Sequence, residues 1–286
     1  MKTFLKLAVQ RKGRLSASSL ELLRDCGIAF SNGNGKLKVS CDNFPLQLIF
    51  LRDDDIPAMV LDGAADLGIV GRNLLAENGD PLQVVQELGF ARCRLSLAVE
   101  RSRTWKGLND LEGRVIATSH PVILADFLDR NGIRARIRRI AGSVEIAPAI
   151  GVADAVCDLV SSGSTLLSNG LREVETVFES SAQLVASPGL GGDQVTLLDR
   201  LLLRIRAVSR ARTHKYILLN APEDSLEPIC GLLPGMKSPT ISRLNQPGWI
   251  SVQSVVPEEA FWGVVDRLHA LGAEGILVLG LEKMVF

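Results

Sequence analysis

The chain has 286 residues, 47% of them hydrophobic, and its 32 lysines and arginines balance 32 aspartates and glutamates. The length allows two or three domains with well-buried cores, while the even charge argues against a nucleic-acid-binding protein that depends on a basic face. We expect a cytoplasmic protein with no membrane partner, because no run approaches the ~20 apolar residues of a membrane span. The start "MKTFLKLAVQRKGRL" predicts a strand instead of a signal peptide. Five scattered cysteines indicate reduced thiols.

The first two thirds of the chain alternate strand patterns with helix patterns, which is typical of an α/β protein. The elements predicted for a first lobe are strand 4–9, a helix from Ser16 or Ser18 to Leu23, strand 46–51, helix 56–61, strand 67–70 and strand 92–99. Residues 100–106 are expected to cross to a second lobe, with strand 114–117, helix 122–131, strand 135–140, a short helix within 144–150 and strand 156–160. Strands within 173–185 would lead back, so that two lobes enclose a cleft. The "NGNGK" segment at 32–36 predicts a hairpin turn.

The last third of the chain has a different order of elements. After a loop at 187–193 and an amphipathic helix at 197–208, the predicted order is strand 216–219, helix 225–233, strand 240–244, strand 250–255, helix 258–271 and strand 275–279. This β-α-β-β-α-β order predicts a ferredoxin-like domain. Such a domain can bind an amino acid, but the fold alone specifies no function.

A small hydroxyl-rich loop follows the predicted buried strand at 156–160. It consists of Ser161, Ser162, Gly163, Ser164 and Thr165, and it leads into a helix. Backbone N–H groups and hydroxyls at a helix start favour a phosphate, and Asp158 on the preceding strand could accept hydrogen bonds from the two hydroxyls of a ribose. The alternative is an ordinary N-cap, for which serine and threonine are also preferred.

Segments along the whole chain share a resemblance to one enzyme family. They are "QRKGRL" at 10–15, "RDDDIPAMVLDGAADLGIVG" at 52–71, "RCRLSLAV" at 92–99, "ATSHP" at 117–121, "GSVEIAP" at 142–148, "DAVCDLVSSGSTLLSNGLREV" at 154–174 and "LLPGMKSPTI" at 232–241. In this order they resemble the long form of ATP phosphoribosyltransferase, the first enzyme of histidine biosynthesis. The resemblance implies a two-lobed catalytic region like that of periplasmic binding proteins, with lobes 1–99 plus 186–210 and 100–185, and a regulatory domain 211–286.

The resemblance also implies the chemistry. The adenine N1 of ATP displaces pyrophosphate from C1 of phosphoribosyl pyrophosphate, and Mg2+ is expected to be held mainly by substrate phosphates and water. The protein must position two polyanions and stabilise the departing charge, so we assign no residue as a catalytic acid or base. The family resemblance further implies histidine as inhibitor and a homo-oligomer, in dimers and hexamers.

Basic side chains after strands are candidates for contacts to the polyanionic substrates. Lys12 and Arg14 lie in the turn after the first predicted strand, and Arg52 lies at the end of the second. Open α/β sheets place ligands at strand ends. Each of the three could instead be a solvated surface charge.

Four acids complete the predicted site. Asp66 and Glu145 are candidates for hydrogen bonds to substrate hydroxyls or magnesium-bound water, while Asp154 and Asp158 belong to the phosphoribosyl-pyrophosphate segment. Asp66 could equally cap or solvate a strand start, and Glu145 could be a first-turn helix acid. The acidic run at 53–55 is predicted to cap a helix, and the three histidines lack the spacing of a zinc site.

Family likeness implies a histidine-sensing site in the C-terminal domain, near Ser238, Thr240 and Ala273. The chain has Asn220-Ala221-Pro222 where some family members have an acid, so the partner of the ligand's amino group is left open.

Three alternatives follow from the same features. A two-lobed solute-binding protein would need export, and a phosphoribosyltransferase acting on a free base would have no evident use for the C-terminal third. That third could also serve only as an oligomerisation module.

Overall fold

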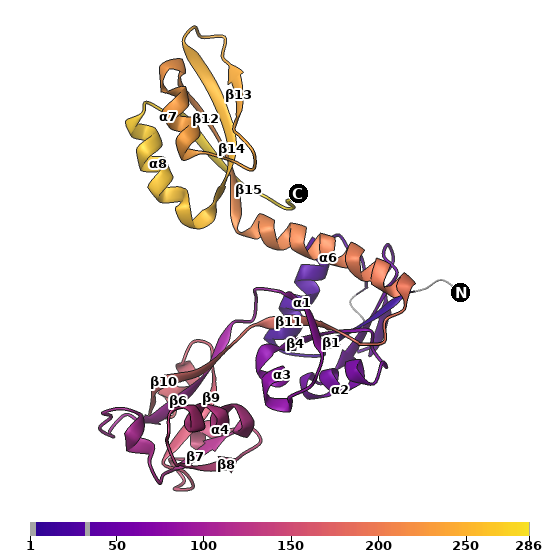
Figure 1. Cartoon of the computed structure of the whole chain (residues 1–286), viewed down its shortest axis with the longest axis vertical. Coiled ribbons are helices and arrows are strands. Elements are labelled where there is room, and N and C mark those ends of the chain that lie inside the picture. Colours follow the sequence, from indigo (N-terminus) through magenta and orange to yellow (C-terminus); the bar gives the residue numbers. More distant parts are fainter. Residues whose placement is uncertain (1–3, 32–34, 286) are drawn as a thin grey trace. The chain divides into compact units, whose positions relative to one another are not determined.

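The computed structural model describes residues 4–31 and 35–285, so part of the turn predicted at 32–36 lies outside the described residues. Two compact units are distinguished: one runs up to Arg24 and from Ile28 to Leu198, and the other comprises Asp25–Gly27 and the chain from Asp199 onward. The first unit holds two mixed β-sheets with their helices, and the second holds one antiparallel sheet with its helices (Figure 1). In the described part of the chain, no helix is both long and apolar enough to cross a membrane.

The first sheet has six strands in the order β2-β3-β1-β4-β11-β5. Their bounds are β1 Leu5–Gln10, β2 Lys38–Ser40, β3 Leu46–Leu51, β4 Leu67–Gly71, β5 Gln83–Glu87 and β11 Ala182–Ala186. The central strand β1 runs parallel to β3 and β4, and the outer strands pair antiparallel. The helical segments of this lobe are α1 Arg14–Asp25, the 3-10 turn η1 Asp53–Asp55, α2 Ile56–Leu61 and α3 Arg72–Asn78.

Gly68 in β4 allows α2 to pack directly on the sheet. A Cβ atom at this position would lie 2.7 Å from Cγ2 of Ile56 and 2.8 Å from Cγ2 of Val60, which is closer than non-bonded carbons approach. Both helix residues are buried. The absence of a side chain at Gly68 therefore lets α2 lie directly against β4.

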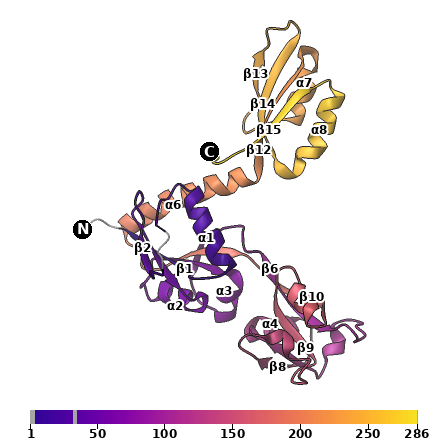
Figure 2. The same ribbon diagram turned by 180° about the vertical axis from the view of Figure 1, so that it is seen from behind.

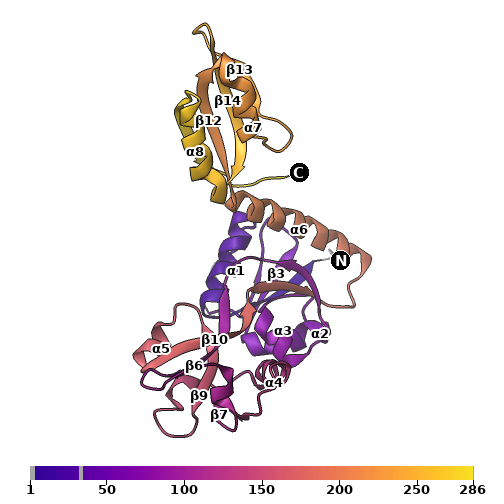
Figure 3. The ribbon, with the colours of Figure 1, turned by 60° about the vertical axis from the view of Figure 1, so that its left-hand side comes forward.

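The second sheet has five strands in the order β10-β6-β9-β7-β8. The bounds in this lobe are β6 Cys93–Glu100, η2 Leu108–Leu111, β7 Val115–Thr118, α4 Pro121–Arg130, β8 Arg136–Arg139, η3 Val144–Ile146, β9 Ala155–Val160, α5 Ser164–Ser168 and β10 Leu171–Ser180. Strands β8, β7 and β9 are parallel, so their carboxyl ends share one edge. The short helix α5 lies beside β10 (Figure 3).

Two crossing segments join the sheets of the first unit, and one of them differs from the prediction. Strand β6 pairs with both β9 and β10, so the chain has already reached the second sheet at Cys93, and the crossing expected at 100–106 is wrong. Between the sheets, Ala182 N–H donates to Phe90 O at 3.0 Å, and Cys93 pairs with Ser180. The return through 173–185 is confirmed, because β10 belongs to the second sheet and β11 to the first.

After the long helix α6 (Gly192–Arg212), the chain forms the predicted β-α-β-β-α-β order. The sheet order is β13-β14-β12-β15, with all neighbours antiparallel, as in a ferredoxin-like domain. The bounds are β12 His214–Pro222, η4 Glu223–Ser225, α7 Leu226–Leu232, β13 Thr240–Arg243, β14 Trp249–Pro257, η5 Glu258–Ala260, α8 Phe261–Ala270 and β15 Glu274–Gly280. Helices α7 and α8 lie on the same face of this sheet (Figure 2).

Several local predictions fail for identifiable reasons. Helix α1 already begins at Arg14, so Ser16 and Ser18 lie inside it instead of capping it. Asp55 is the N-cap of α2, but its side chain makes no capping hydrogen bond. Helix α6 starts five residues before the predicted position and absorbs the end of the expected loop. The sequence analysis missed β2, β5 and α3, which are short and largely polar.

Candidate active site

The hydroxyl-rich loop joins β9 to α5 at the carboxyl edge of the second sheet. Gly163 has φ +79° and is the N-cap of α5, so the serines and the threonine do not take the N-cap position that was the alternative explanation for them. Ser162 Oγ lies 3.0 Å from Ser164 Oγ and 3.5 Å from Ser164 N. A left-handed residue at this turn favours glycine, and it leaves the loop hydroxyls exposed.

This loop forms one wall of a cavity of about 160 Å³. The cavity is lined by Arg14, Glu145, Asp158, Leu159, Val160, Ser161, Ser162, Gly163, Ser164, Thr165 and Leu166. The structure thus brings together the predicted loop, one predicted cation and two predicted acids, although they come from segments far apart in the sequence. A cavity with hydroxyls, a guanidinium and carboxylates has donors for a phosphate and acceptors for sugar hydroxyls.

The cation reaches the loop from the opposite lobe. Arg14 is the first residue of α1, directly after the turn that follows β1, and its Nη1 donates a hydrogen bond to Ser161 Oγ. The preceding Gly13 has φ +111°, which turns the chain sharply between strand and helix. The site is therefore shared between the two lobes of the first unit.

The charge of one acid of the cavity acts on the other. Burial raises the pKa of Asp158, the backbone N–H of Leu159 lowers it through a 2.8 Å hydrogen bond, and the nearby charge of Glu145 raises it further. Glu145 lies in the η3 turn after a left-handed Ser143. Two carboxylates held near each other favour a bound ligand that donates hydrogen bonds to them.

Four other predicted substrate-binding residues lie elsewhere. Lys12 and Arg52 are exposed and do not line this cavity. Asp66 is buried at the amino end of β4, where it accepts hydrogen bonds from Lys6 N at 2.7 Å and Gln194 Nε2 at 2.8 Å. Asp154 precedes β9, accepts a 2.9 Å hydrogen bond from Val115 N and lies 3.4 Å from Arg114. Both acids hold the framework together at the amino ends of their strands.

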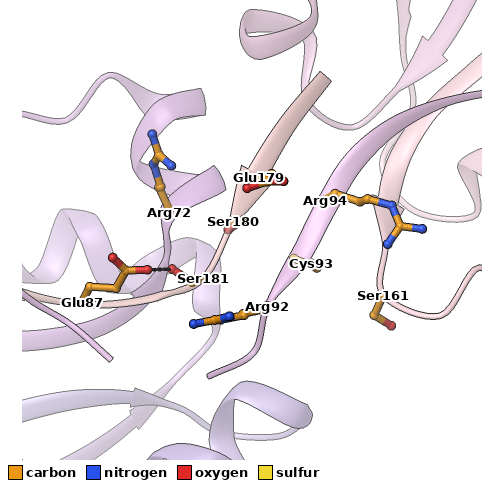
Figure 4. Close-up of a pocket in the computed structure, with 9 residues that line it drawn as sticks. All are labelled: Arg72, Glu87, Arg92, Cys93, Arg94, Ser161, Glu179, Ser180 and Ser181. Atoms are coloured by element: carbon orange, nitrogen blue, oxygen red, sulfur yellow. Dashed lines mark hydrogen bonds between the residues drawn. The ribbon is translucent and has the colours of Figure 1, made fainter. Parts of the chain in front are cut away.

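Two further cavities, of about 480 and 340 Å³, adjoin the loop, and Ser161 lines both of them. Figure 4 shows the larger one, with Ser180 and Cys93 on the crossing segments between Arg72 and Ser161. The sequence analysis missed its arginines, Arg72, Arg92 and Arg94. The sequence "RCR" at 92–94, around the start of β6, was the only signal for Arg92 and Arg94. Arg72 lies on α3, a helix that was not predicted.

These arginines differ in how they are held. The Arg94 guanidinium makes a two-pronged contact with Glu173, which also accepts a 2.7 Å hydrogen bond from Ser96, and this pairing lowers the pKa of Glu173. Arg72 lies over the ring of Phe178, at 4.9 Å from its centroid. Arg94 is thus fixed by a carboxylate, whereas Arg72 is positioned by an aromatic face.

The C-terminal domain has its own cavity of about 430 Å³. Ser238 and Thr240 line it together with Tyr216, Gln253 and neighbouring residues. Ala273 is buried in the domain core and does not line this cavity. Asn220 lies on β12, next to Gly275 of β15.

The topology of the first unit defines the class of protein. It has two mixed α/β lobes joined by crossing strands, as in periplasmic binding proteins. The putative sulfonate-binding protein SsuA of Methylobacillus flagellatus has this fold, with a TM-score of 0.51 at 15% identity over 71% of this chain and 67% of its own. The ATP phosphoribosyl transferase (HisG:HisZ) complex of Thermotoga maritima gives a TM-score of 0.58 at 26% identity over 71% of this chain and 99% of the matched chain.

Sequence comparison defines the family. The family model of ATP phosphoribosyltransferase matches residues 52–207, and that of the HisG C-terminal domain matches residues 211–283. The ATP phosphoribosyltransferase of Cytophaga hutchinsonii is 52% identical over 285 residues, covering both chains completely. The chain belongs to the ATP phosphoribosyltransferase family, with the C-terminal domain of its long form.

Asp158, within β9, and Asp154, just before it, are expected to respond oppositely to replacement by asparagine. Because burial raises the pKa of Asp158, its charge destabilises the ligand-free fold at pH 7, and this effect vanishes as the pH falls toward the ordinary carboxyl pKa of about 4. Asp158→Asn should therefore raise Tm at pH 7 and change it little near pH 4. Asp154→Asn should lower Tm at pH 7, since it removes the ion pair with Arg114. Thermal unfolding followed by circular dichroism measures both, and a lower Tm for Asp158→Asn at pH 7 would contradict the assignment.

Proposed function

We propose that the chain carries out the reaction of its family in the cytoplasm: transfer of the 5-phosphoribosyl group of phosphoribosyl pyrophosphate to N1 of ATP, with release of pyrophosphate. The observation that carries this proposal is the contact of Arg14, from one lobe, with the hydroxyl loop of the other, beside Asp158 and Glu145. The 5-phosphate needs hydrogen-bond donors such as the loop hydroxyls, and the ribose hydroxyls need carboxylate acceptors. The pyrophosphate needs a cation such as Arg14.

We assign each part of the site a role. The loop hydroxyls and the backbone around Gly163 bind the 5-phosphate, while Asp158 and Glu145 accept hydrogen bonds from the ribose hydroxyls. Arg14 then faces the departing pyrophosphate, where it stabilises the negative charge that develops as the bond to C1 breaks. Adenine N1 is already a nucleophile, so positioning of the two substrates supplies the remaining catalysis.

The side chains of the pocket also indicate how the proposed Mg2+ would be held. In the described part of the chain, no three His, Cys, Asp or Glu side chains gather as a metal-binding group. The pocket instead offers two carboxylates, Asp158 and Glu145, which suits an ion that keeps several waters and binds substrate phosphates. These two acids would hold the ion through water, and the ion would neutralise charge on the pyrophosphate.

Two proposals concern the C-terminal domain. Ser238 and Thr240 line its cavity and are assigned to histidine, which the domain would sense as a feedback inhibitor. Ala273 lies apart from that cavity within one chain, so its predicted role needs a second chain or a larger binding surface. The sheet face opposite α7 and α8 carries Leu277 and Leu279, both at least half exposed, and an uncovered apolar sheet face supports the proposed homo-oligomer.

The reaction can be tested directly. We expect an absorbance assay to detect phosphoribosyl-ATP when ATP, phosphoribosyl pyrophosphate and Mg2+ are supplied, and no product when adenine replaces ATP. Product from adenine alone would instead identify a phosphoribosyltransferase of free bases.

Arg14→Gln tests the assignment of the cation. Loss of a charged hydrogen bond costs about 1.5–3 kcal/mol, so kcat/KM for phosphoribosyl pyrophosphate should fall roughly 10- to 100-fold. The KM for ATP should change much less. Arg136→Gln, on the exposed strand β8, is the matched control and should behave as the unchanged enzyme. Equal effects of Arg14→Gln on both substrates would remove Arg14 from the pyrophosphate site.

Thr240→Val tests the regulatory proposal, because it keeps the volume of the side chain and deletes its hydroxyl. Histidine inhibition should weaken while uninhibited turnover stays nearly intact, and calorimetry should show weaker histidine binding. Ser242→Ala, on the same strand but outside the cavity, should change neither. If the intact protein binds no histidine at millimolar concentration, the domain is an oligomerisation module.

A further inference from the structure

A buried polar cluster joins the two lobes beside the cavity of about 340 Å³ that Arg14 and Ser161 also line. It consists of Asn73 at the start of α3, Ser180 at the end of β10 and His120 just before α4, all less than a tenth exposed. Asn73 Nδ2 lies 2.9 Å from Nε2 of His120, and Ser180 Oγ lies 2.9 Å from Asn73 Oδ1. The cluster therefore takes one residue from each lobe and one from a crossing segment.

The hydrogen bonds fix the protonation state of His120. Ser180 Oγ accepts the backbone N–H of Asn73 at 3.1 Å, so its own O–H donates to Asn73 Oδ1. The amide NH2 of Asn73 then faces Nε2 of His120, which must accept. The imidazole is consequently neutral, with its proton on Nδ1, 2.9 Å from Ser119 Oγ. The Cys93 thiol also contacts Ser180, and burial raises the pKa of this thiol, which keeps it un-ionised.

Gly71 leaves the space that this arrangement needs. A Cβ atom at Gly71 would lie 2.3 Å from Asn73 Oδ1, although the backbone there has an ordinary φ of −73°. The glycine is therefore required by the side chain of Asn73 and not by its own conformation. Any larger residue at 71 must push the Asn73 amide out of the cluster.

A second contact joins the same two helices. The Glu77 carboxylate, on α3, accepts the N–H groups of Val122 at 2.9 Å and Ile123 at 3.0 Å, in the first turn of α4. The N-cap residue of α4, His120, makes no capping hydrogen bond with its own side chain. The first lobe thus supplies the cap for a helix of the second.

We propose that His120 is a positioning residue for phosphoribosyl transfer: its neutral imidazole, through Asn73 and Ser180, holds the lobe that carries Arg14 in register with the lobe that carries the hydroxyl loop. This inference rests on the proposed function. The loop belongs to one lobe and can bind the 5-phosphate alone, whereas charge stabilisation by Arg14 needs both lobes at the correct separation. Loss of the contact should therefore lower kcat more than it raises the KM for phosphoribosyl pyrophosphate.

Protonation of His120 opposes its contact with Asn73. An imidazolium would place an N–H at Nε2 against the NH2 of Asn73, donor against donor. The groups that act on His120 are Glu77 of α3 and Asp54 of η1, which favour its charged form, and burial, which outweighs them and lowers its pKa. Thr118 Oγ1 accepts the backbone N–H of His120 and carries no charge. The contact is therefore complete at neutral pH and lost as the pH falls through the lowered pKa of His120.

Two substitutions of His120 separate positioning from packing. His120→Phe keeps a ring but removes the acceptor, and kcat should fall roughly 10- to 100-fold, the range expected for a small displacement of reacting groups. His120→Gln offers an uncharged acceptor and should retain most of kcat, without the decline at acid pH that is expected of the unchanged enzyme. Gly71→Ala should reproduce the loss of kcat without altering any group that hydrogen-bonds in the cluster.

Histidine-selective NMR provides a readout independent of activity, because the chain has only three histidines. In the full chain, dialysed free of histidine, His120 should titrate below the ordinary value of about 6.5. Asn73→Asp should raise its midpoint by about one pH unit or more, since a carboxylate in place of the amide favours the imidazolium. The signals of His214 and His269 serve as internal references.

The outcomes are distinguishable. Normal kcat in His120→Phe, or an acid decline that persists in His120→Gln, would overturn the positioning role. An unmoved His120 midpoint in Asn73→Asp would overturn the contact itself. An unchanged enzyme that makes no phosphoribosyl-ATP would refute the proposed function instead, a result seen before any variant is compared.

Discussion

A binding site shared by two lobes depends on the distance between them, and here buried polar contacts beside the crossing segments set that distance. The sheets alone do not suffice, because two strands that cross between lobes can bend and twist together. Asn73, Ser180 and His120 tie each lobe to a crossing segment, and their burial makes the contact specific. An unpaired donor or acceptor at this place would lose a hydrogen bond without gaining water. The positions of Arg14 and the hydroxyl loop follow from this constraint.

The acids of the first unit divide into those that stabilise the fold and those that the fold accommodates at some cost. Asp66 and Asp154 accept backbone N–H groups and pair with neighbouring side chains, so their charge is satisfied within the chain. Asp158 shares a cavity with Glu145, and burial disfavours its charge. Groups poised for a ligand are commonly the ones left unsatisfied without it. Carboxylates whose charge is paired within the chain therefore mark the framework of the first unit, and a carboxylate whose charge is disfavoured there marks the site.

Much of the fold could be predicted because apolar periodicity is a local property. Strand 46–51 and helix 56–61 have the predicted bounds, and the C-terminal order of elements is confirmed. The sheet to which β6 belongs depends on pairing with distant strands, which no local pattern contains. The loop, Arg14, Asp158 and Glu145 do lie together, and whether they bind substrate stays a prediction. Asp66 and Asp154 precede their strands. The rule that ligands bind at the carboxyl ends of strands would therefore have excluded both from the predicted binding site.

The cap that Glu77 provides for α4 also bears on how the two lobes unfold. The first-turn N–H groups of Val122 and Ile123 find their acceptor only when the other lobe is folded and docked. Opening the first lobe therefore removes the cap of α4, and opening the second lobe takes the N–H partners from Glu77, so the free energies of the two openings are coupled. Such coupling favours a single cooperative transition for the first unit over stepwise melting of separate lobes. It also means that the second lobe, expressed alone, would begin with a frayed α4.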